Sequence, residues 1–580
     1  MVSRETIQNK RVIELTSKLR RAFNYNLPIR PGAGSMTANS STPSVIRFDG
    51  FELDTANGEL RRSDRTIPLR PQACRALIVL AGRAGELVTR DDLRGAIWGW
   101  EKFVDFEHGL NLCIRQVREA LGDDAHAQRY IQTLPRRGYR FVAPVQMPGS
   151  PRRAVIAVLP FENLSGDPGQ EYLSDAVTEE MITELGRLDP ERLGVIARTS
   201  VMRYKNARRG LRGIARDMGI DYVLEGSVRS HASRIRVAVQ LVRVADQTHL
   251  WAESYERRMT DLLDLQADVA RIVAAQIDLK LSVTQQERLG RGRSLNLEAH
   301  EAYLRGRLHL RKMTREGTET AIKYFQQALT IEPQNAMVYA AMADAYIGMT
   351  SWHSAPLDTM PQAREAARKA LALEPDLAVA HALMGTVHLL FDWDWKAAGH
   401  EFNRAIELDP NLADGHVGYA ALLTALGQFE TALRELKIAQ SLDPMSPSVH
   451  GDELWMWFGA RRYDEAVAES RRWLEVDANF GRAYWTMALA LSYAGKHNAA
   501  IGAARKGVRV SDSPFAAVAL AEVYARGGNT RQARTVLNTL ESAPHDKYVC
   551  AYNMAAVYAA LGETERAFES LQRGVLQRSD

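Results

Sequence analysis

Residues 105–122, DFEHGLNLCIRQVREALG, and residues 130–142, YIQTLPRRGYRFV, decide the fold of the N-terminal part of this chain. The first stretch repeats apolar residues at helical spacing, at Leu110, Ile114, Val117 and Leu121. This spacing predicts a helix with one buried face. The second stretch has two strand-like runs on either side of Pro135-Arg136-Arg137-Gly138, which predicts a hairpin with two arginines at its tip.

The other face of the predicted helix is polar and basic. It carries His108, Asn111, Leu112, Arg115, Gln116, Arg118 and Glu119. An α-helix fits the major groove of DNA, and arginines beside it can enter a minor groove or hold phosphate. Residues 45–145 also contain two predicted strands and two further predicted helices. The segment therefore predicts an α+β domain suited to binding DNA.

This segment resembles the OmpR/PhoB-type winged-helix family of bacterial transcription factors. The resemblance rests on six motifs: Ile67–Arg70 before the first helix, Val88–Leu93 opening the second helix, Ile97–Gly99 closing it, Ile114–Asp123, Ile131–Thr133 and Arg137–Phe141. It implies that Arg136 or Arg137 reaches the DNA backbone or minor groove. It also implies that the loop from Trp98 to Phe106 faces RNA polymerase.

The resemblance further implies that the third helix faces DNA through Asn111, Arg115, Gln116 and Arg118. With the neighbouring polar positions, the predicted DNA-binding residues are His108, Asn111, Arg115, Gln116, Arg118, Arg136, Arg137, Tyr139 and Arg140.

Length and composition predict a large multidomain protein. A chain of 580 residues is long enough for several domains, and its 46% hydrophobic content suffices for packed cores. A net charge of +4 permits nucleic-acid binding without arguing for it. The three cysteines form no CxxC motif, so we expect buried thiols in a reducing compartment. No apolar run approaches the roughly 18–20 residues that span a bilayer, and we expect a cytoplasmic protein.

Catalytic and metal-binding motifs are not found in the sequence. It contains no GxxxxGK[ST], no HExxH and no Cys/His ligand spacing. We therefore predict no enzyme activity, no cofactor and no metal site. Residues 1–44 are basic and end in a Pro/Gly/Ser/Thr-rich stretch, which predicts a disordered leader. The sequence leaves open whether translation starts at Met1 or at Met36.

A small α/β domain is predicted for residues 152–282. Ala154–Phe161 is a continuous apolar run typical of a buried strand, and three runs at 221–229, 234–244 and 248–255 predict a meander. Helices are expected at 171–188 and 262–281. The domain resembles the TolB N-terminal-like module through Ile156–Phe161, Tyr222–Val228 and His249–Glu253. That resemblance implies no particular chemistry.

From residue 297 to 578 the chain repeats with a period of about 34 residues. Alanines mark the period: Ala398, Ala432, Ala466, Ala500, Ala533 and Ala567. This is the tetratricopeptide (TPR) pattern, and it predicts an array of about eight helix pairs stacked into a superhelix. Such a superhelix has a concave groove for a peptide or a partner protein. The tryptophans of the array either line this groove or pack between helices.

The order winged helix, small α/β domain and all-α TPR superhelix resembles the HilA-like group of transcriptional regulators. We predict a cytoplasmic bacterial regulator whose partners are promoter DNA, RNA polymerase and a protein or peptide in the TPR groove. One alternative is a TPR scaffold whose winged helix contacts only protein, and a weaker one is an enzyme in the α/β domain. Control of DNA binding by occlusion of the winged helix or by homodimerisation stays open.

Overall fold

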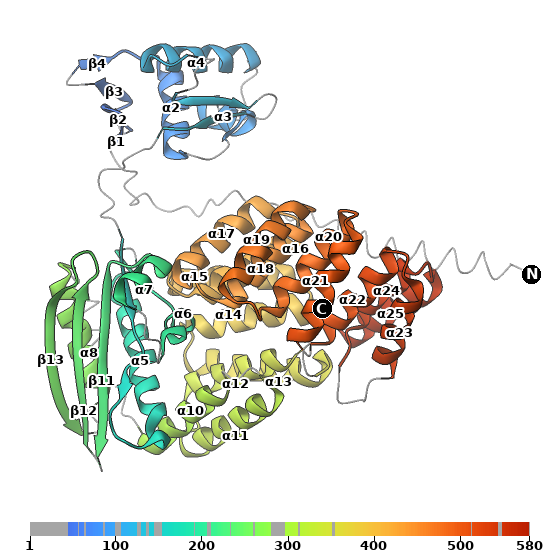
Figure 1. The fold of residues 1–580 in the computed structure, drawn as a ribbon. Coiled ribbons are helices and arrows are strands. Elements are labelled where there is room, and N and C mark those ends of the chain that lie inside the picture. The colour runs from blue at the N-terminus through green and yellow to red at the C-terminus, as the bar shows by residue number, and fades with distance from the viewer. Residues whose placement is uncertain are drawn as a thin grey trace, which may run out of the picture. The chain divides into compact units, whose positions relative to one another are not determined.

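The computed structural model describes residues 45–55, 57–62, 65–84, 88–98, 106–124, 129–134, 138–143, 153–190, 192–205, 210–231, 234–258, 262–279, 296–310, 314–350, 354–511, 513–542 and 548–578. The predicted leader, residues 1–44, lies outside this range. The chain divides into two compact units, residues 1–152 and 153–580, which Figure 1 draws with their elements labelled.

The first unit opens with a four-stranded antiparallel sheet in the order β1-β2-β3-β4. Its strands are β1 (Val45–Phe48), β2 (Phe51–Asp54), β3 (Glu59–Arg62) and β4 (Arg65–Ile67). The prediction of two strands here was wrong. Each strand has only three or four residues, which is too short for a clear alternating pattern. Asp49, Gly50 and Gly58 turn the chain between strands with positive φ angles.

Three helices follow: α2 (Pro71–Gly82), α3 (Arg90–Trp98) and α4 (Phe106–Leu121). The predicted helix and its apolar stripe are confirmed, because Leu110, Ile114, Val117 and Leu121 are all buried in α4. They belong to one core with residues of the sheet and of α2, including Phe51 and Leu77. Cys74 and Cys113 are buried in the same core, and burial raises the pKa of both thiols.

A second, three-stranded sheet has the order β5-β7-β6. The predicted hairpin is confirmed as β6 (Ile131–Leu134) and β7 (Gly138–Phe141), while β5 is Val88–Thr89. The sequence had placed Val88 and Thr89 in the second helix, which was wrong. Thr89 and Asp92 cap α3 reciprocally, each side chain accepting a hydrogen bond of 3.1 Å from the backbone N–H of the other. The helix therefore begins at Arg90, and the two residues before it pair with β7.

The second unit begins with a mixed sheet in the order β10-β8-β11-β12-β13, with β9 beside β11. The strands are β8 (Ala154–Val158), β9 (Glu162–Asn163), β10 (Leu193–Val195), β11 (Tyr222–His231), β12 (Arg234–Arg243) and β13 (Thr248–Arg258). β10, β8 and β11 are parallel, and β11 to β13 form the predicted antiparallel meander.

Helices cover this sheet and build its core. They are α5 (Glu171–Gly186), α6 (Arg198–Val201), α7 (Leu211–Met218) and α8 (Leu262–Gln276), with 3-10 turns η1 (Pro168–Gln170) and η2 (Met202–Tyr204). Alternate residues of the strands enter different apolar clusters: Ile156 packs with α5 and α8, whereas Ala157 packs with α6 and α7. The short strand β9 and the turn-long helix α6 were not predicted from the sequence, because neither is long enough to show a period.

The rest of the second unit is helical. The helices are α10 (Leu297–Leu310), α11 (Arg315–Ile331), α12 (Ala336–Met349), α13 (Pro356–Leu373), α14 (Ala378–Val387) continued by a π-helical turn η4 (His388–Asp392), α15 (Trp395–Leu408), α16 (Ala413–Ala425), α17 (Phe429–Leu442), α18 (Pro447–Gly459), α19 (Tyr463–Val476), α20 (Gly481–Tyr493), α21 (His497–Val510), α22 (Pro514–Arg526), α23 (Thr530–Glu541), α24 (Ala551–Ala560) and α25 (Thr564–Gln577). Within the described residues they make eight consecutive helix pairs, and Figure 1 shows them stacked as a superhelix.

The periodic alanines explain how the pairs stack. All six alanines that mark the period lie in the second helix of a pair and are buried. A small side chain at that position lets neighbouring helices approach closely, and each pair covers the apolar face of the next. The predicted fold class, a winged-helix region followed by a long TPR superhelix, is confirmed. Of the tryptophans, Trp485 is buried, whereas Trp393 and Trp455 are exposed.

The α/β part of the second unit is joined to the superhelix by buried polar contacts. The backbone N–H of Ala197 donates to the carbonyl of Leu442, with a distance of 2.7 Å. Next to it, the Ser200 hydroxyl donates to the carboxylate of Asp443. Arg307 in α10 makes an ion pair of 2.9 Å with Glu179 in α5. Because buried polar groups need partners, these contacts fix how the two parts pack.

Candidate nucleic-acid interface

The outer face of α4 presents Asn111 and Arg115 to solvent. The side chain of Arg115 is 76% exposed and makes an ion pair of 2.8 Å with Glu119, one helical turn further on. Gln116 is half-buried. His108 belongs to the helix, but its side chain lies outside the described part of the chain. Of the residues predicted to face DNA from this helix, Asn111 and Arg115 are therefore the most accessible.

Two neighbours fix the orientation of the Asn111 amide. Its Oδ1 accepts a hydrogen bond of 3.0 Å from the hydroxyl of Tyr139 and one of 3.2 Å from Nη2 of Arg90. Arg90 also lies 3.3 Å from that hydroxyl, and its guanidinium packs over the Tyr139 ring. Because Oδ1 is occupied on the protein side, the two hydrogens on Nδ2 are turned away from these partners.

Arg118 does not lie where the sequence had placed it. Its guanidinium points inward and donates to the carbonyl of Ile131 at 2.9 Å and to Oγ1 of Thr133 at 2.8 Å. It also lies 3.9 Å from the buried carboxylate of Asp123. With 14% of its side chain exposed, Arg118 fastens α4 to the hairpin. The helical period places Arg118 on the same face as Arg115, but its hydrogen bonds to β6 turn its side chain toward the hairpin.

The predicted DNA-binding residues of the hairpin also differ in how much of each side chain reaches the surface. The ring of Tyr139 is buried, so its contribution to the surface is the hydroxyl that holds Asn111. Arg140 is half-buried and donates to Oε1 of Gln132 over 3.4 Å. Arg136 and Arg137, the predicted tip of the wing, lie outside the described residues, as does most of the loop predicted to face RNA polymerase.

A surface hollow of about 560 Å³ lies between α4 and the hairpin. It is lined by Asn111, Ile114, Arg115, Arg118, Glu119, Asp123, Asp124, Thr133 and Tyr139. Two arginines thus share the hollow with three carboxylates, so its lining is not uniformly basic. Arg90, at the start of α3, was not among the predicted DNA-binding residues, because only the folded chain brings it to Asn111 and Tyr139.

No helix in the described parts of the chain combines the length and the apolarity that a bilayer crossing needs.

Comparison with known proteins identifies two segments. Residues 64–141 match the family "Transcriptional regulatory protein, C terminal". Residues 152–272 match the family "HilA/YgeH-like transcriptional regulator, second domain". The second match stands where the sequence had suggested a TolB N-terminal-like module.

Individual relatives extend these matches. "Putative adenylate cyclase 3" of Rhizobium meliloti is 34% identical over 254 residues, which cover 43% of this chain and 42% of that protein. The transcriptional regulator HilA of Salmonella paratyphi A is 27% identical over 431 residues, 72% of this chain and 74% of HilA. The chain therefore spans less than half the length of the first relative and about three quarters of the second. Among solved structures, the DNA binding domain of Escherichia coli CadC is 28% identical, with a TM-score of 0.16, over 18% of this chain and 96% of that chain.

The chain thus carries an OmpR/PhoB-type winged helix, then a segment that matches the second domain of HilA/YgeH-like transcriptional regulators, and then a TPR superhelix, and its similarity to HilA supports this architecture.

Proposed function

We propose that this protein binds double-stranded promoter DNA through the outer face of α4 and the β6–β7 hairpin. The observation that carries the proposal is the exposed pair Asn111 and Arg115 on a helix fastened rigidly to that hairpin. The TPR superhelix binds a protein or peptide partner, and RNA polymerase is a further partner. The division into residues 45–145, 152–282 and 297–578 is part of this proposal, as is a location in the cytoplasm.

The chemistry of Asn111 fits a DNA contact. With Oδ1 held by Tyr139 and Arg90, the amide offers its two Nδ2 hydrogens outward. Acceptors for such donors are the phosphate oxygens and the purine N7 atoms of the major groove. A side chain that is already held in place loses little conformational freedom on binding.

Arg115 is available to DNA despite its ion pair with Glu119. Both side chains are mostly exposed, and an exposed ion pair one helical turn apart contributes only about 0.3–0.5 kcal/mol. A guanine edge or a phosphate group offers a stronger, charge-assisted contact. The carboxylate of Glu119 therefore competes weakly with DNA for Arg115.

Replacing Arg115 with alanine should weaken binding to the preferred sequence by about 1–3 kcal/mol, because the residue contacts a base or a phosphate group. The measurement is fluorescence anisotropy of the full-length protein with labelled promoter DNA at several salt concentrations. Arg271→Ala is a matched control, since Arg271 also pairs with a carboxylate on an exposed helix face, in α8. Equal affinity of the Arg115→Ala variant and the parent protein would contradict the role of Arg115.

Replacing Glu119 with glutamine should have the opposite effect. Without its carboxylate, Arg115 loses its competitor and the phosphate backbone loses a repelling charge, so binding should tighten about twofold at low salt. The gain should disappear at high salt, where exposed charges are screened. Weaker binding by this variant would show that Glu119 itself supports the complex.

The alternative function is a scaffold whose winged helix contacts only protein. It predicts that the full-length protein selects no preferred sequence from a random DNA pool at any salt concentration. Our proposal predicts selection of a short site and an affinity that falls steeply with salt, because phosphate contacts release counterions.

Occlusion and dimerisation are separated by comparing DNA binding of the full chain with that of its first compact unit, residues 1–152. Weaker binding by the full chain supports occlusion of the winged helix, and tighter binding supports dimerisation.

We further propose that the protein acts without catalysis. The transcriptional regulator HilA shares 431 aligned residues with this chain, whereas the relative named as a cyclase shares 254. Formation of cyclic AMP from ATP by the full-length protein would overturn this part of the proposal.

A further inference from the structure

Three consecutive helix pairs of the superhelix carry a histidine in their first helix and a glutamate in their second. In two of them the side chains touch: Nδ1 of His381 lies 2.6 Å from Glu401, and Nδ1 of His416 lies 2.8 Å from Glu435. The other ring nitrogen, Nε2, bonds the carbonyl of Pro375 or Pro410. These two pairs are closed contacts between neighbouring helices.

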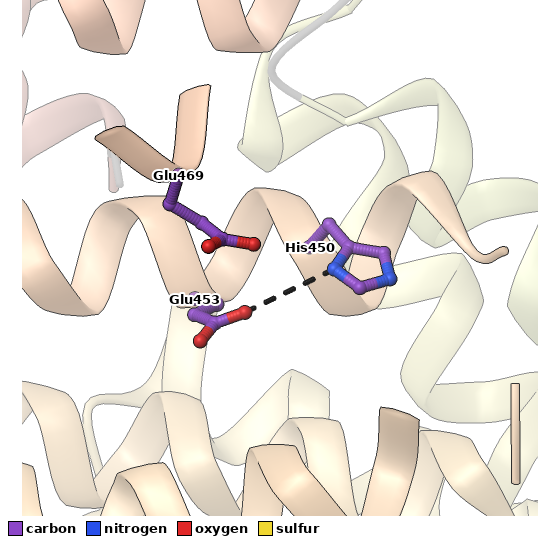
Figure 2. Close-up of side chains that lie close together, drawn as sticks. All are labelled: His450, Glu453 and Glu469. Carbon is purple, nitrogen blue, oxygen red and sulfur yellow. Dashed lines mark ion pairs between the residues drawn. The ribbon is translucent and has the colours of Figure 1, made fainter. Parts of the chain in front are cut away.

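The third pair, His450 in α18 and Glu469 in α19, is built differently. A second carboxylate, Glu453, stands one turn after the histidine, where the earlier repeats have Met384 and Tyr419. One ligand atom from each of His450, Glu453 and Glu469 lies within 4.8 Å of the other two. Figure 2 shows both carboxylates pointing toward the histidine.

The group is well enclosed, and His450 and Glu453 do not bond each other directly: the amide nitrogen of Gln440 donates to Glu453 and lies near Nδ1 of His450. Nδ1 of His450 is 3.9 Å from Glu453, which is too long for a hydrogen bond. Glu469 is paired with Arg472 instead. The side chains of His450 and Glu453 are only 4% and 3% exposed.

The tautomer of His450 leaves a lone pair facing the carboxylates. Nε2 lies 2.9 Å from the carbonyl of Pro444, and a carbonyl only accepts hydrogen bonds, so Nε2 carries the hydrogen. Nδ1 is then the acceptor, in agreement with the Gln440 amide nitrogen placed 3.4 Å away. A backbone carbonyl on the second ring nitrogen is the usual support of a metal-bound histidine.

The ring of His450 is also held by packing, because the indole of Trp473 lies on it with 3.5 Å between the ring centroids.

We propose that His450, Glu453 and Glu469 bind one divalent transition-metal cation, with Zn²⁺ as the best-fitting ion. One imidazole nitrogen and two carboxylate oxygens suit Zn²⁺, with a water molecule as fourth ligand. Bonds of about 2.0–2.2 Å to one ion bring ligand atoms to roughly 3–4 Å from one another, so side-chain movement alone completes the site. The ion would cross-link α18 and α19.

Lys437 places a positive charge beside Glu453. Its Nζ lies 3.0 Å from Glu453, and its side chain is 54% exposed. It can therefore turn to solvent when an ion enters. Removing its charge should strengthen metal binding, whereas removing either carboxylate should weaken it.

The test is a titration of untagged full-length protein, first stripped of metal by a chelator, with Co²⁺. Visible absorption should show one bound Co²⁺ per chain, displaced by Zn²⁺. Glu453→Gln and Glu469→Gln should each weaken binding at least tenfold, and Lys437→Met should tighten it. Glu435→Gln, which removes the glutamate of a closed pair, is the matched control and should leave binding unchanged.

The outcomes separate the site from adventitious metal binding. Far-UV circular dichroism of each variant reports whether the helices fold. If a glutamine variant unfolds, the tighter binding expected of Lys437→Met still decides the question. Stoichiometric binding that neither glutamine variant weakens would overturn the proposal. So would a protein that gives no Co²⁺ absorption spectrum, or a Lys437→Met variant that binds Co²⁺ as the parent protein does.

Discussion

Replacing Phe402 with alanine should lower the free energy of unfolding of the superhelix by about 3–5 kcal/mol, the usual cost of removing a large buried aromatic side chain. Phe402 in α15 is fully buried. Its ring lies against Gly385 in α14 and Gly418 in α16, where an added Cβ would come within 2.8 Å and 2.2 Å of it. The two glycines leave room for the ring, so one side chain holds three helices together.

The measurement is urea unfolding of the full-length protein, combined with amide hydrogen exchange. Exchange is needed because a chain with two compact units does not have to unfold in one step. Protection should fall most in α14–α16. Phe568→Ala is the control, since Phe568 in α25 is 37% exposed. A loss below about 1 kcal/mol in the Phe402 variant would mean that the ring is not a central packing element.

Replacing Gly138 with alanine should disrupt the hairpin and with it DNA binding. Gly138 has a φ angle of 153°, and a Cβ there would lie 2.1 Å from the carbonyl oxygen of Val88. Backbone strain of about 1–3 kcal/mol and a steric clash of about 1–3 kcal/mol would both oppose the β5–β7 pairing. That is a large part of the stability of a small domain, which is about 5–15 kcal/mol.

Thermal unfolding of the first unit and anisotropy with promoter DNA check this prediction. The second unit should keep its melting transition. Gly122→Ala is the matched control, because Gly122 also has a positive φ but no atom lies within 4 Å of an added Cβ. Equal losses in the two variants would show that backbone conformation, and not the close approach of β5, makes Gly138 necessary.

The sequence by itself determined the long periodic helices and their buried faces. The stripe of Leu110, Ile114, Val117 and Leu121 is a local property, since residues three and four apart share one side of a helix. The alanine period likewise predicted the stacked helix pairs, because each repeat packs on its neighbour and needs a small residue at the same place. Both patterns can be read without knowing which distant segments meet.

Tertiary structure alone decided where polar side chains point and which of them meet. The sequence predicts Arg115 and Arg118 on the same polar face of one helix. In the structure Arg118 turns inward, because a carbonyl and a hydroxyl of β6 accept its hydrogen bonds. Strands of two to four residues, such as β5, are defined by their partners and not by a pattern of their own. The group of His450, Glu453 and Glu469 likewise brings together side chains of two different helices, α18 and α19. Hydrogen bonding and ion pairing depend on contacts between separated segments, whereas the apolar period depends on neighbours along the chain.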